Sequence, residues 1–185
     1  MHAFTYHCPT EIIFGKDAQL KTADYIRKYG GSRVLLVYGS GSIERSGLLA
    51  QLCQILTENH VTYELFGGAK AKTPVEGPGV ADPSEAVRLK GRAGGGSVLD
   101  TAKAIAIGAA NVPTDIWQFW IREKTPQKAL PVGAILTISA AGSESSDSAV
   151  LTNLAEGVKR GLNTELNRPR FAIMNPELTL TLPPY

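Results

Sequence analysis

Cysteine and histidine are scarce in this sequence. Of its 185 residues only two are cysteines, Cys8 and Cys53, and three are histidines, His2, His7 and His60. Cys8 lies near an expected strand and Cys53 inside an expected helix, which favours reduced thiols over a disulfide framework or a cysteine-based metal site. Because reduced thiols are typical of the cytosol, we expect a cytoplasmic protein.

A large excess of one charge and long apolar runs are also lacking. The 19 basic and 17 acidic residues leave a formal net charge of +2, and the two signs are mixed along the chain. This balance disfavours a broad basic surface. No apolar run reaches the roughly 18 residues of a membrane span, and the first residues lack the basic and apolar regions of a secretion signal. We therefore expect neither nucleic acid nor a membrane as a partner.

The apolar residues that are present, 43% of the chain, form short segments separated by glycine-rich turns. Residues 33–38 form a continuous apolar segment, and a Gly-Ser loop, a helical apolar pattern and a strand pattern over 61–66 follow it. This order predicts a parallel βαβ unit, which binds ligands at the carboxyl ends of its strands. We therefore predict an α/β, Rossmann-like fold with a mostly parallel sheet and flanking helices, as a single domain over residues 1–185.

Further strands and helices fit this fold class. Strands are predicted over 10–14, 131–138 and 171–174, and helices over 18–29 and within the glycine-initiated segment 93–108. In the last helix one face is apolar, formed by Val98, Leu99, Ala102, Ile105 and Ala106. Its polar residues Asp100 and Lys103 fall away from that face.

Residues 69–92 depart from the regular pattern. This stretch is rich in proline and glycine and contains neither isoleucine nor an aromatic residue, so we predict a loop. A loop here would remove a central strand and expose sheet edges, across which the chain could pair with itself as a homo-oligomer.

Two small-residue loops are candidates for binding phosphate. One follows the buried segment 33–38 and consists of Gly39, Ser40, Gly41 and Ser42; the other, over 94–97, precedes a helix. Glycine permits a close backbone approach, and a helix N-terminus offers unpaired N–H groups. A single such loop is equally consistent with a plain turn, whereas two favour a dinucleotide.

Neither loop matches a standard nucleotide fingerprint. The P-loop lysine is missing, which disfavours a kinase or NTPase, and so is the third glycine of G-x-G-x-x-G. No carboxylate directly follows Tyr38. A carboxylate there would hold a ribose 2′-hydroxyl but repel a 2′-phosphate, so its absence favours NADP(H).

The sequence resembles the iron-containing (group III) alcohol dehydrogenases, particularly their NADPH-dependent butanol dehydrogenase or aldehyde reductase branch. Five collinear motifs carry the resemblance: RVLLVYGSGSI, GGGSVLDTAKAIA, ALPVGAILT, AAGSE and RPRFAIMNPELTLTLP. It implies a nucleotide-binding domain that is normally followed by an all-helical, metal-binding domain. The family's metal ligands lie beyond the last motif, and no histidine of this chain matches one, so we expect no metal site here.

The resemblance also implies roles for single residues. Gly39, Ser40, Gly41 and Ser42 would face the adenosine ribose and its 2′-phosphate. Gly95, Gly96, Ser97 and Asp100 would face the pyrophosphate and the nicotinamide ribose, with Thr137 lining the cleft. Ser143, Lys159 and Leu178 would lie near the nicotinamide, where Ser143 and Lys159 are the weak candidates for a catalytic proton donor. Two alternatives stay open: Lys159 as a solvated surface residue, and Asp100 as an exposed acid favoured by the helix dipole.

Three departures from the family limit this transfer. Ala141 stands where the family has a threonine, and Glu44 where it has a basic residue, although Arg45 beside it could substitute. Residues 69–92 do not match, and a pair of compensating reading-frame shifts would produce such a segment.

The function that these features predict is hydride transfer between NADP(H) and an aldehyde or primary alcohol, without a metal in this chain. The alternative is a non-catalytic NADP-binding remnant, or a domain that requires a partner chain.

Overall fold

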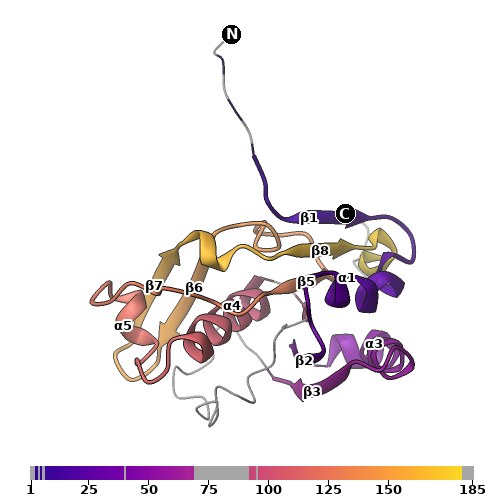
Figure 1. The fold of residues 1–185 in the computed structure, drawn as a ribbon, viewed down its shortest axis with the longest axis horizontal. Helices are drawn as coiled ribbons and strands as arrows, with labels where there is room; N and C mark the ends of the chain where they lie inside the picture. Colours follow the sequence, from indigo (N-terminus) through magenta and orange to yellow (C-terminus); the bar gives the residue numbers. More distant parts are fainter. Residues whose placement is uncertain are drawn as a thin grey trace.

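The computed structural model describes residues 3, 5, 7–39, 41–68, 92–94 and 96–180 and places a six-stranded parallel sheet at the centre of the chain (Figure 1). Its strands are β1 (Glu11–Phe14), β2 (Arg33–Tyr38), β3 (Thr62–Phe66), β4 (Arg92–Gly94), β5 (Gly133–Leu136) and β8 (Phe171–Met174). They lie side by side in the order β1-β8-β5-β4-β2-β3. The predicted α/β fold with a parallel sheet is confirmed.

Helices cover both faces of this sheet. The helices α1 (Thr22–Lys28) and α3 (Leu48–Glu58) pack on one face, and α4 (Gly96–Ala110) packs on the other. In β2, Val34 and Leu36 point to the first face, whereas Val37 points to α4. Because both faces are buried, the strand is a continuous apolar run rather than an alternating one.

Short helices complete the chain: η1 (Ala18–Lys21), α2 (Ser42–Arg45), α5 (Trp117–Trp120), η2 (Glu165–Asn167) and η3 (Pro176–Thr179). The predicted helix 18–29 is thus η1 followed by α1. No helix in the ranges described is long and apolar enough to cross a membrane.

A close approach between β5 and β8 depends on Gly133. A Cβ atom at this position would lie within 3.0 Å of the ring of Phe171. That ring is buried and stacks on Tyr29, with ring centroids 5.9 Å apart. Gly133 therefore makes room for the aromatic side chain that joins β8 to α1.

A two-stranded antiparallel hairpin that the sequence did not predict packs on the far side of α4. It consists of β6 (Ser148–Asn153) and β7 (Val158–Asn163). Ala104 and Ile107 of α4 contact Ala149 and Leu151 of the hairpin, together with α5. Helix α4 therefore lies between the parallel sheet and the hairpin, and both sides of it are buried (Figure 1).

The strand β4 corrects the prediction for residues 69–92. Arg92 pairs with Val37 of β2, and Ala93 pairs with Ile135 of β5. The sheet is thus continuous between β2 and β5, and the predicted exposed edge in its centre is wrong. The sequence Arg-Ala-Gly carries no apolar run, so only its backbone pairing to two neighbours identifies it as a strand. The rest of the predicted loop, 69–91, lies outside the described residues.

Candidate cofactor-binding site

The two glycine loops lie at the point where the chain reverses its direction across the sheet. From β2 the chain continues through α3, on one face, to the edge strand β3. From β4, the other neighbour of β2, it continues through α4, on the opposite face, to β5. In open α/β sheets ligands bind outside the carboxyl ends of the strands at this reversal. The loops after β2 and β4 are the small-residue loops that the sequence singled out.

The loop after β2 turns at Gly41. This residue directly precedes α2 and has φ 57. A positive φ of this size suits glycine. The Nη1 atom of Arg45 lies 2.5 Å from where a Cβ of Gly41 would stand. Ser42 is exposed at the start of α2, and Ser40 lies outside the described residues. The guanidinium of Arg45 therefore folds back over the glycine loop.

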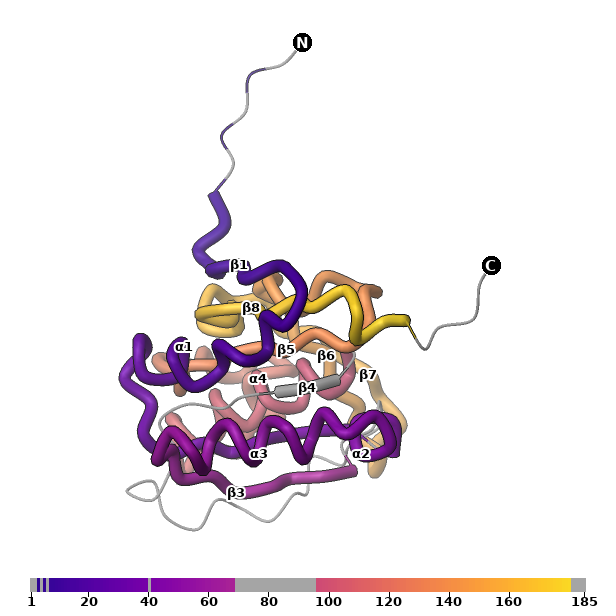
Figure 2. Tube along the Cα trace, turned by 90° about the vertical axis from the view of Figure 1, so that its right-hand side faces the viewer, coloured from indigo at the N-terminus to yellow at the C-terminus, as the bar shows by residue number. Residues whose placement is uncertain are grey.

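The loops after β2 and β3 meet beside this turn. The amide of Gly68 donates to the carbonyl oxygen of Gly39 over 3.4 Å. The phenol carbon and oxygen of Tyr38 lie 2.7 Å from where a Cβ of Gly67 would stand. Figure 2 shows α2 at the end of the molecule where β3 also finishes. The adenosine side of the predicted site is therefore built from the ends of two neighbouring strands.

The loop after β4 leads directly into α4, a helix of 15 residues that begins at Gly96. Ser97 is exposed in its first turn, and Gly95 lies outside the described residues. The amide groups of a first helical turn have no partner within the helix and carry a partial positive charge. This end of α4 can therefore accept a phosphate group.

The small polar loop 139–147 lies against the same helix end. A Cβ at Gly96 would stand 3.9 Å from the Cβ of Ala141 and 4.0 Å from the Oγ of Ser143. The Ser143 hydroxyl, which is buried, donates to Oδ1 of Asp100 over 3.0 Å. The structure thus joins two predicted site residues that are far apart in the sequence. Asp100 is half-buried and has a specific partner, rather than being a fully exposed acid.

Thr137 and Leu178 also follow the carboxyl ends of sheet strands. Thr137 comes directly after β5 and is half-buried. Leu178 lies in η3, just after β8, and packs against the apolar cluster formed with α1 and α3. By topology both residues lie at the same edge of the sheet as the two glycine loops.

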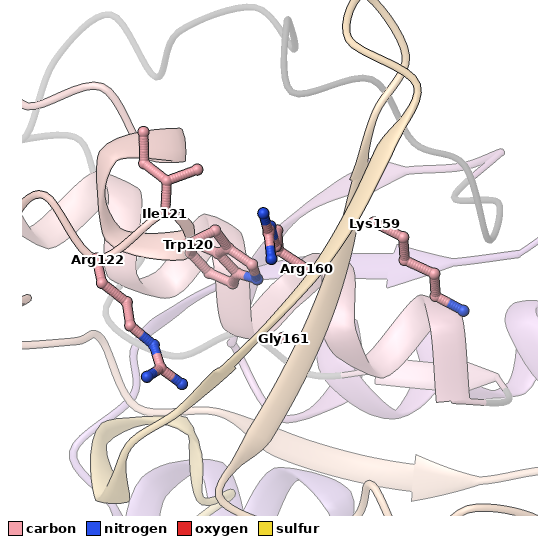
Figure 3. Close-up of a pocket in the computed structure, with 6 residues that line it drawn as sticks. All are labelled: Trp120, Ile121, Arg122, Lys159, Arg160 and Gly161. Carbon is pink, nitrogen blue, oxygen red and sulfur yellow. The ribbon is translucent and has the colours of Figure 1, made fainter.

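Lys159 lies apart from these residues. It belongs to β7, where it is exposed and pairs in register with Thr152. Within the described ranges it donates no hydrogen bond to Ser143 or Asp100. It borders a groove that Trp120, Ile121, Arg122, Arg160 and Gly161 also line. Figure 3 shows its side chain leaving β7 on the side opposite to Arg160. The surface alternative for Lys159 therefore agrees with its position.

Sequence reasoning did not predict the burial of Lys103. The residue was expected away from the apolar face of its helix that packs on the sheet, and it lies off that face, but its side chain is 0% exposed. Its Nζ donates to the carbonyl oxygens of Ser146 and Ser148 over 3.0 Å and 2.8 Å. The hairpin covers the side of α4 that would otherwise face solvent. A signal was present, because small alanines surround Lys103 on several sides of the helix.

The iron that the resembled family would bind has no matching set of side chains in the part of the chain that the structure describes. No group of three or more His, Cys, Asp or Glu residues there could hold a metal ion. His7 and His60 are exposed, and His2 lies outside the described residues.

The structure places two small-residue loops at the reversal of an open α/β sheet, and comparison with known proteins identifies the family. The model of the family "Iron-containing alcohol dehydrogenase" matches residues 9–176. The chain therefore belongs to the iron-containing alcohol dehydrogenases.

Named relatives use either nicotinamide cofactor. The chain is 39% identical to "Probable NADH-dependent butanol dehydrogenase 2" of Bacillus subtilis, over 99% of this chain and 47% of that protein. It is 36% identical to "NADPH-dependent aldehyde reductase YqhD" of Escherichia coli, over 100% of this chain and 48% of that protein. The crystal structure of NADH-dependent butanol dehydrogenase A from Thermotoga maritima superposes with a TM-score of 0.91 at 35% identity, covering 99% of this chain and 46% of that one. The chain thus spans about half the length of these relatives.

Proposed function

We propose that this chain is the nucleotide-binding part of an oxidoreductase that transfers a hydride between NADP(H) and an aldehyde or primary alcohol. The observation that carries the proposal is the position of both glycine loops at the reversal of the sheet, one of them at the N-terminus of α4. Membership of the alcohol dehydrogenase family supports the reaction class.

The residues at the carboxyl ends of the sheet strands would bind different parts of the dinucleotide. Gly39, Ser40, Gly41 and Ser42 would hold the adenosine ribose, and Gly95, Gly96 and Ser97 the pyrophosphate. Asp100 and Ser143 would orient the nicotinamide ribose, between Thr137 and Leu178. The nicotinamide, when bound, supplies or accepts the hydride. The protein would contribute a fixed orientation of the dinucleotide.

NADP(H) is our proposed cofactor because of Arg45. Its guanidinium lies over Gly41, where it could pair with a ribose 2′-phosphate. Neither Gly39 nor Ser42 brings a carboxylate that would repel this phosphate. Sequence similarity does not distinguish NADPH from NADH as the cofactor, since the named relatives include NADH-dependent and NADPH-dependent enzymes.

Reduction by this chain alone would need a proton donor other than a metal-bound group. Ser143 and Lys159 are the candidates, and the structure favours neither. The Ser143 hydroxyl already donates to Asp100, and Lys159 is exposed on β7. These two observations favour the alternative function, a chain that holds NADP(H) without turnover or that acts with a partner chain.

Steady-state assays distinguish the two functions. Purified protein is mixed with NADPH or NADH and a series of short aldehydes, with and without a chelator. NADPH consumption that survives chelation would support metal-independent reduction. Tight NADPH binding without consumption would support the alternative, and the absence of binding to either cofactor would refute both.

A cytoplasmic location and self-association are further proposals. Exposed Ile12 and Phe14 lie on the edge strand β1, which pairs on one side with β8. An apolar edge strand of this kind can pair with a second copy. Light scattering of wild type and Phe14→Lys tests the association, and cell fractionation tests the location.

A further inference from the structure

We propose that Lys103 is a positioning residue for the nicotinamide side of the cofactor site. Its buried ammonium group holds the loop 139–147 against α4, so that Ser143 meets Asp100. The inference rests on the proposed function only for its consequence, the selective loss of cofactor affinity.

The contacts of Lys103 are those of a buried clamp. Its side chain is 0% exposed. Nζ donates to the carbonyl oxygen of Ser148 over 2.8 Å, to that of Ser146 over 3.0 Å, and to the Ser146 hydroxyl over 3.4 Å. These bonds fix the place where the polar loop becomes strand β6. Burial of an ammonium group is costly unless such bonds offset it. The buried Lys103 therefore favours the one loop conformation in which these acceptors surround its ammonium group.

Two other side chains hold the same stretch. Nη1 of Arg168 donates to the carbonyl oxygen of Ser145 over 2.8 Å. Nδ2 of Asn167 donates to that of Asp147 over 3.0 Å, and Asn167 is itself buried. Four successive carbonyl groups, from 145 to 148, thus accept bonds from side chains. Arg168 and Asn167 lie at η2, whereas Lys103 connects the stretch to α4, the helix that begins at the proposed phosphate site.

Asp100 and Lys103 lie on neighbouring turns of α4 and bind the loop at two points. Asp100 accepts from Ser143, and Lys103 binds Ser146 and Ser148. Within the described residues, the partly buried bond from Ser143 to Asp100 would be left to hold the loop to these two α4 residues if Lys103 lost its charge. Gly142, with φ 70, makes a left-handed turn beside Ser143 that suits glycine. We therefore expect Ser143 to leave Asp100 when Lys103 is replaced.

The effect is confined to one side of the site. The adenosine loop at Gly41 follows β2 and leads through α2 to α3, on the other face of the sheet. The hydrogen bonds from Nζ of Lys103 to Ser146 and Ser148 run instead to the polar loop and the start of β6. Loss of the clamp should thus weaken binding of the whole dinucleotide and leave binding of its adenosine half intact.

The experiment compares Lys103→Met with wild type and with Ile26→Val. Ile26 is buried on the opposite face of the sheet and serves as a control for general loss of stability. Fluorescence titration measures the Kd for NADPH. Calorimetry measures the Kd for adenosine 2′,5′-bisphosphate. We expect Lys103→Met to bind NADPH about tenfold more weakly, the equivalent of one charged hydrogen bond, and the bisphosphate within about twofold of wild type. Equal weakening of both ligands, or of neither, would overturn the proposal.

Two additions keep the test decisive. Amide hydrogen exchange of residues 143–148 should be faster in Lys103→Met than in Ile26→Val, and unchanged exchange there would refute the clamp without reference to any ligand. Lys103→Arg, which retains donors, replaces Lys103→Met if the latter does not fold, and should keep exchange closer to wild type. Wild-type protein that bound no dinucleotide would refute the proposed function, while the exchange measurement would still decide the role of Lys103.

Discussion

Removal of the Ser143 hydroxyl should cost both stability and cofactor affinity. The hydroxyl is buried and donates to Oδ1 of Asp100 over 3.0 Å. A hydrogen bond to a charged group contributes about 1.5–3 kcal/mol when both partners are buried. Asp100 is half-buried, so water can partly replace the lost donor, and we expect Ser143→Ala to cost about 1 kcal/mol. For a domain of this size that corresponds to a fall in Tm of about 3 °C.

Urea unfolding and NADPH titration together test this expectation. Ser139→Ala is the matched control, because Ser139 belongs to the same loop and is exposed. Ser143→Ala should lower the unfolding midpoint at constant slope and weaken NADPH binding about fivefold, since the freed carboxylate no longer has a fixed orientation. Ser139→Ala should match wild type in both assays. Equal behaviour of the two variants would contradict the assigned role of the Ser143–Asp100 pair.

Three further predictions follow from single contacts. Arg45→Gln should weaken NADPH binding about tenfold and leave NADH binding unchanged, by removing the guanidinium over the glycine loop; equal losses for both cofactors would contradict a 2′-phosphate role. Gly133→Ala should lower the free energy of unfolding by about 2 kcal/mol or more, because its Cβ would lie within 3.0 Å of the buried Phe171 ring, and an unchanged urea midpoint would refute this close packing. A hydrogen bond from Lys28 lowers the pKa of Glu11, so this pair contributes stability that is present above pH 4.5 and lost as pH falls through the lowered pKa. Glu11→Gln should therefore be less stable than wild type at pH 7, with the difference vanishing in acid, and a difference that persisted at low pH would argue against the ion pair.

The buried strands could be predicted because both faces of the sheet are covered. Residues 33–38 and 171–174 were expected as strands and form β2 and β8 with the same bounds. Continuous apolar segments of this length have few other conformations available in an α/β chain. The two glycine loops could also be placed, since parallel strands bring their carboxyl ends to one edge.

Features that depend on tertiary contacts could not be predicted in this way. β4 has no apolar run and exists through backbone pairing with β2 and β5. β7 is mostly exposed, so its residues do not alternate strongly enough to indicate a strand. The burial of Lys103 was not predicted because the hairpin that covers this side of its helix was unknown. The Ser143–Asp100 bond likewise depends on how loop 139–147 folds back onto α4.

The most direct measurement of the central claim is dinucleotide binding by variants of two glycines in α4. A side chain at Gly96, the first residue of the helix, would begin 3.9 Å from the Cβ of Ala141 and 4.0 Å from the Oγ of Ser143, at the helix end where we propose that the phosphate binds. Gly108 lies near the other end of the helix, and a Cβ there would stand 3.5 Å from Ile116, an ordinary contact. Gly96→Val should weaken NADPH binding about 100-fold, and Gly108→Ala should bind like wild type. Unchanged affinity in Gly96→Val, with wild-type binding intact, would place the cofactor elsewhere and contradict the account.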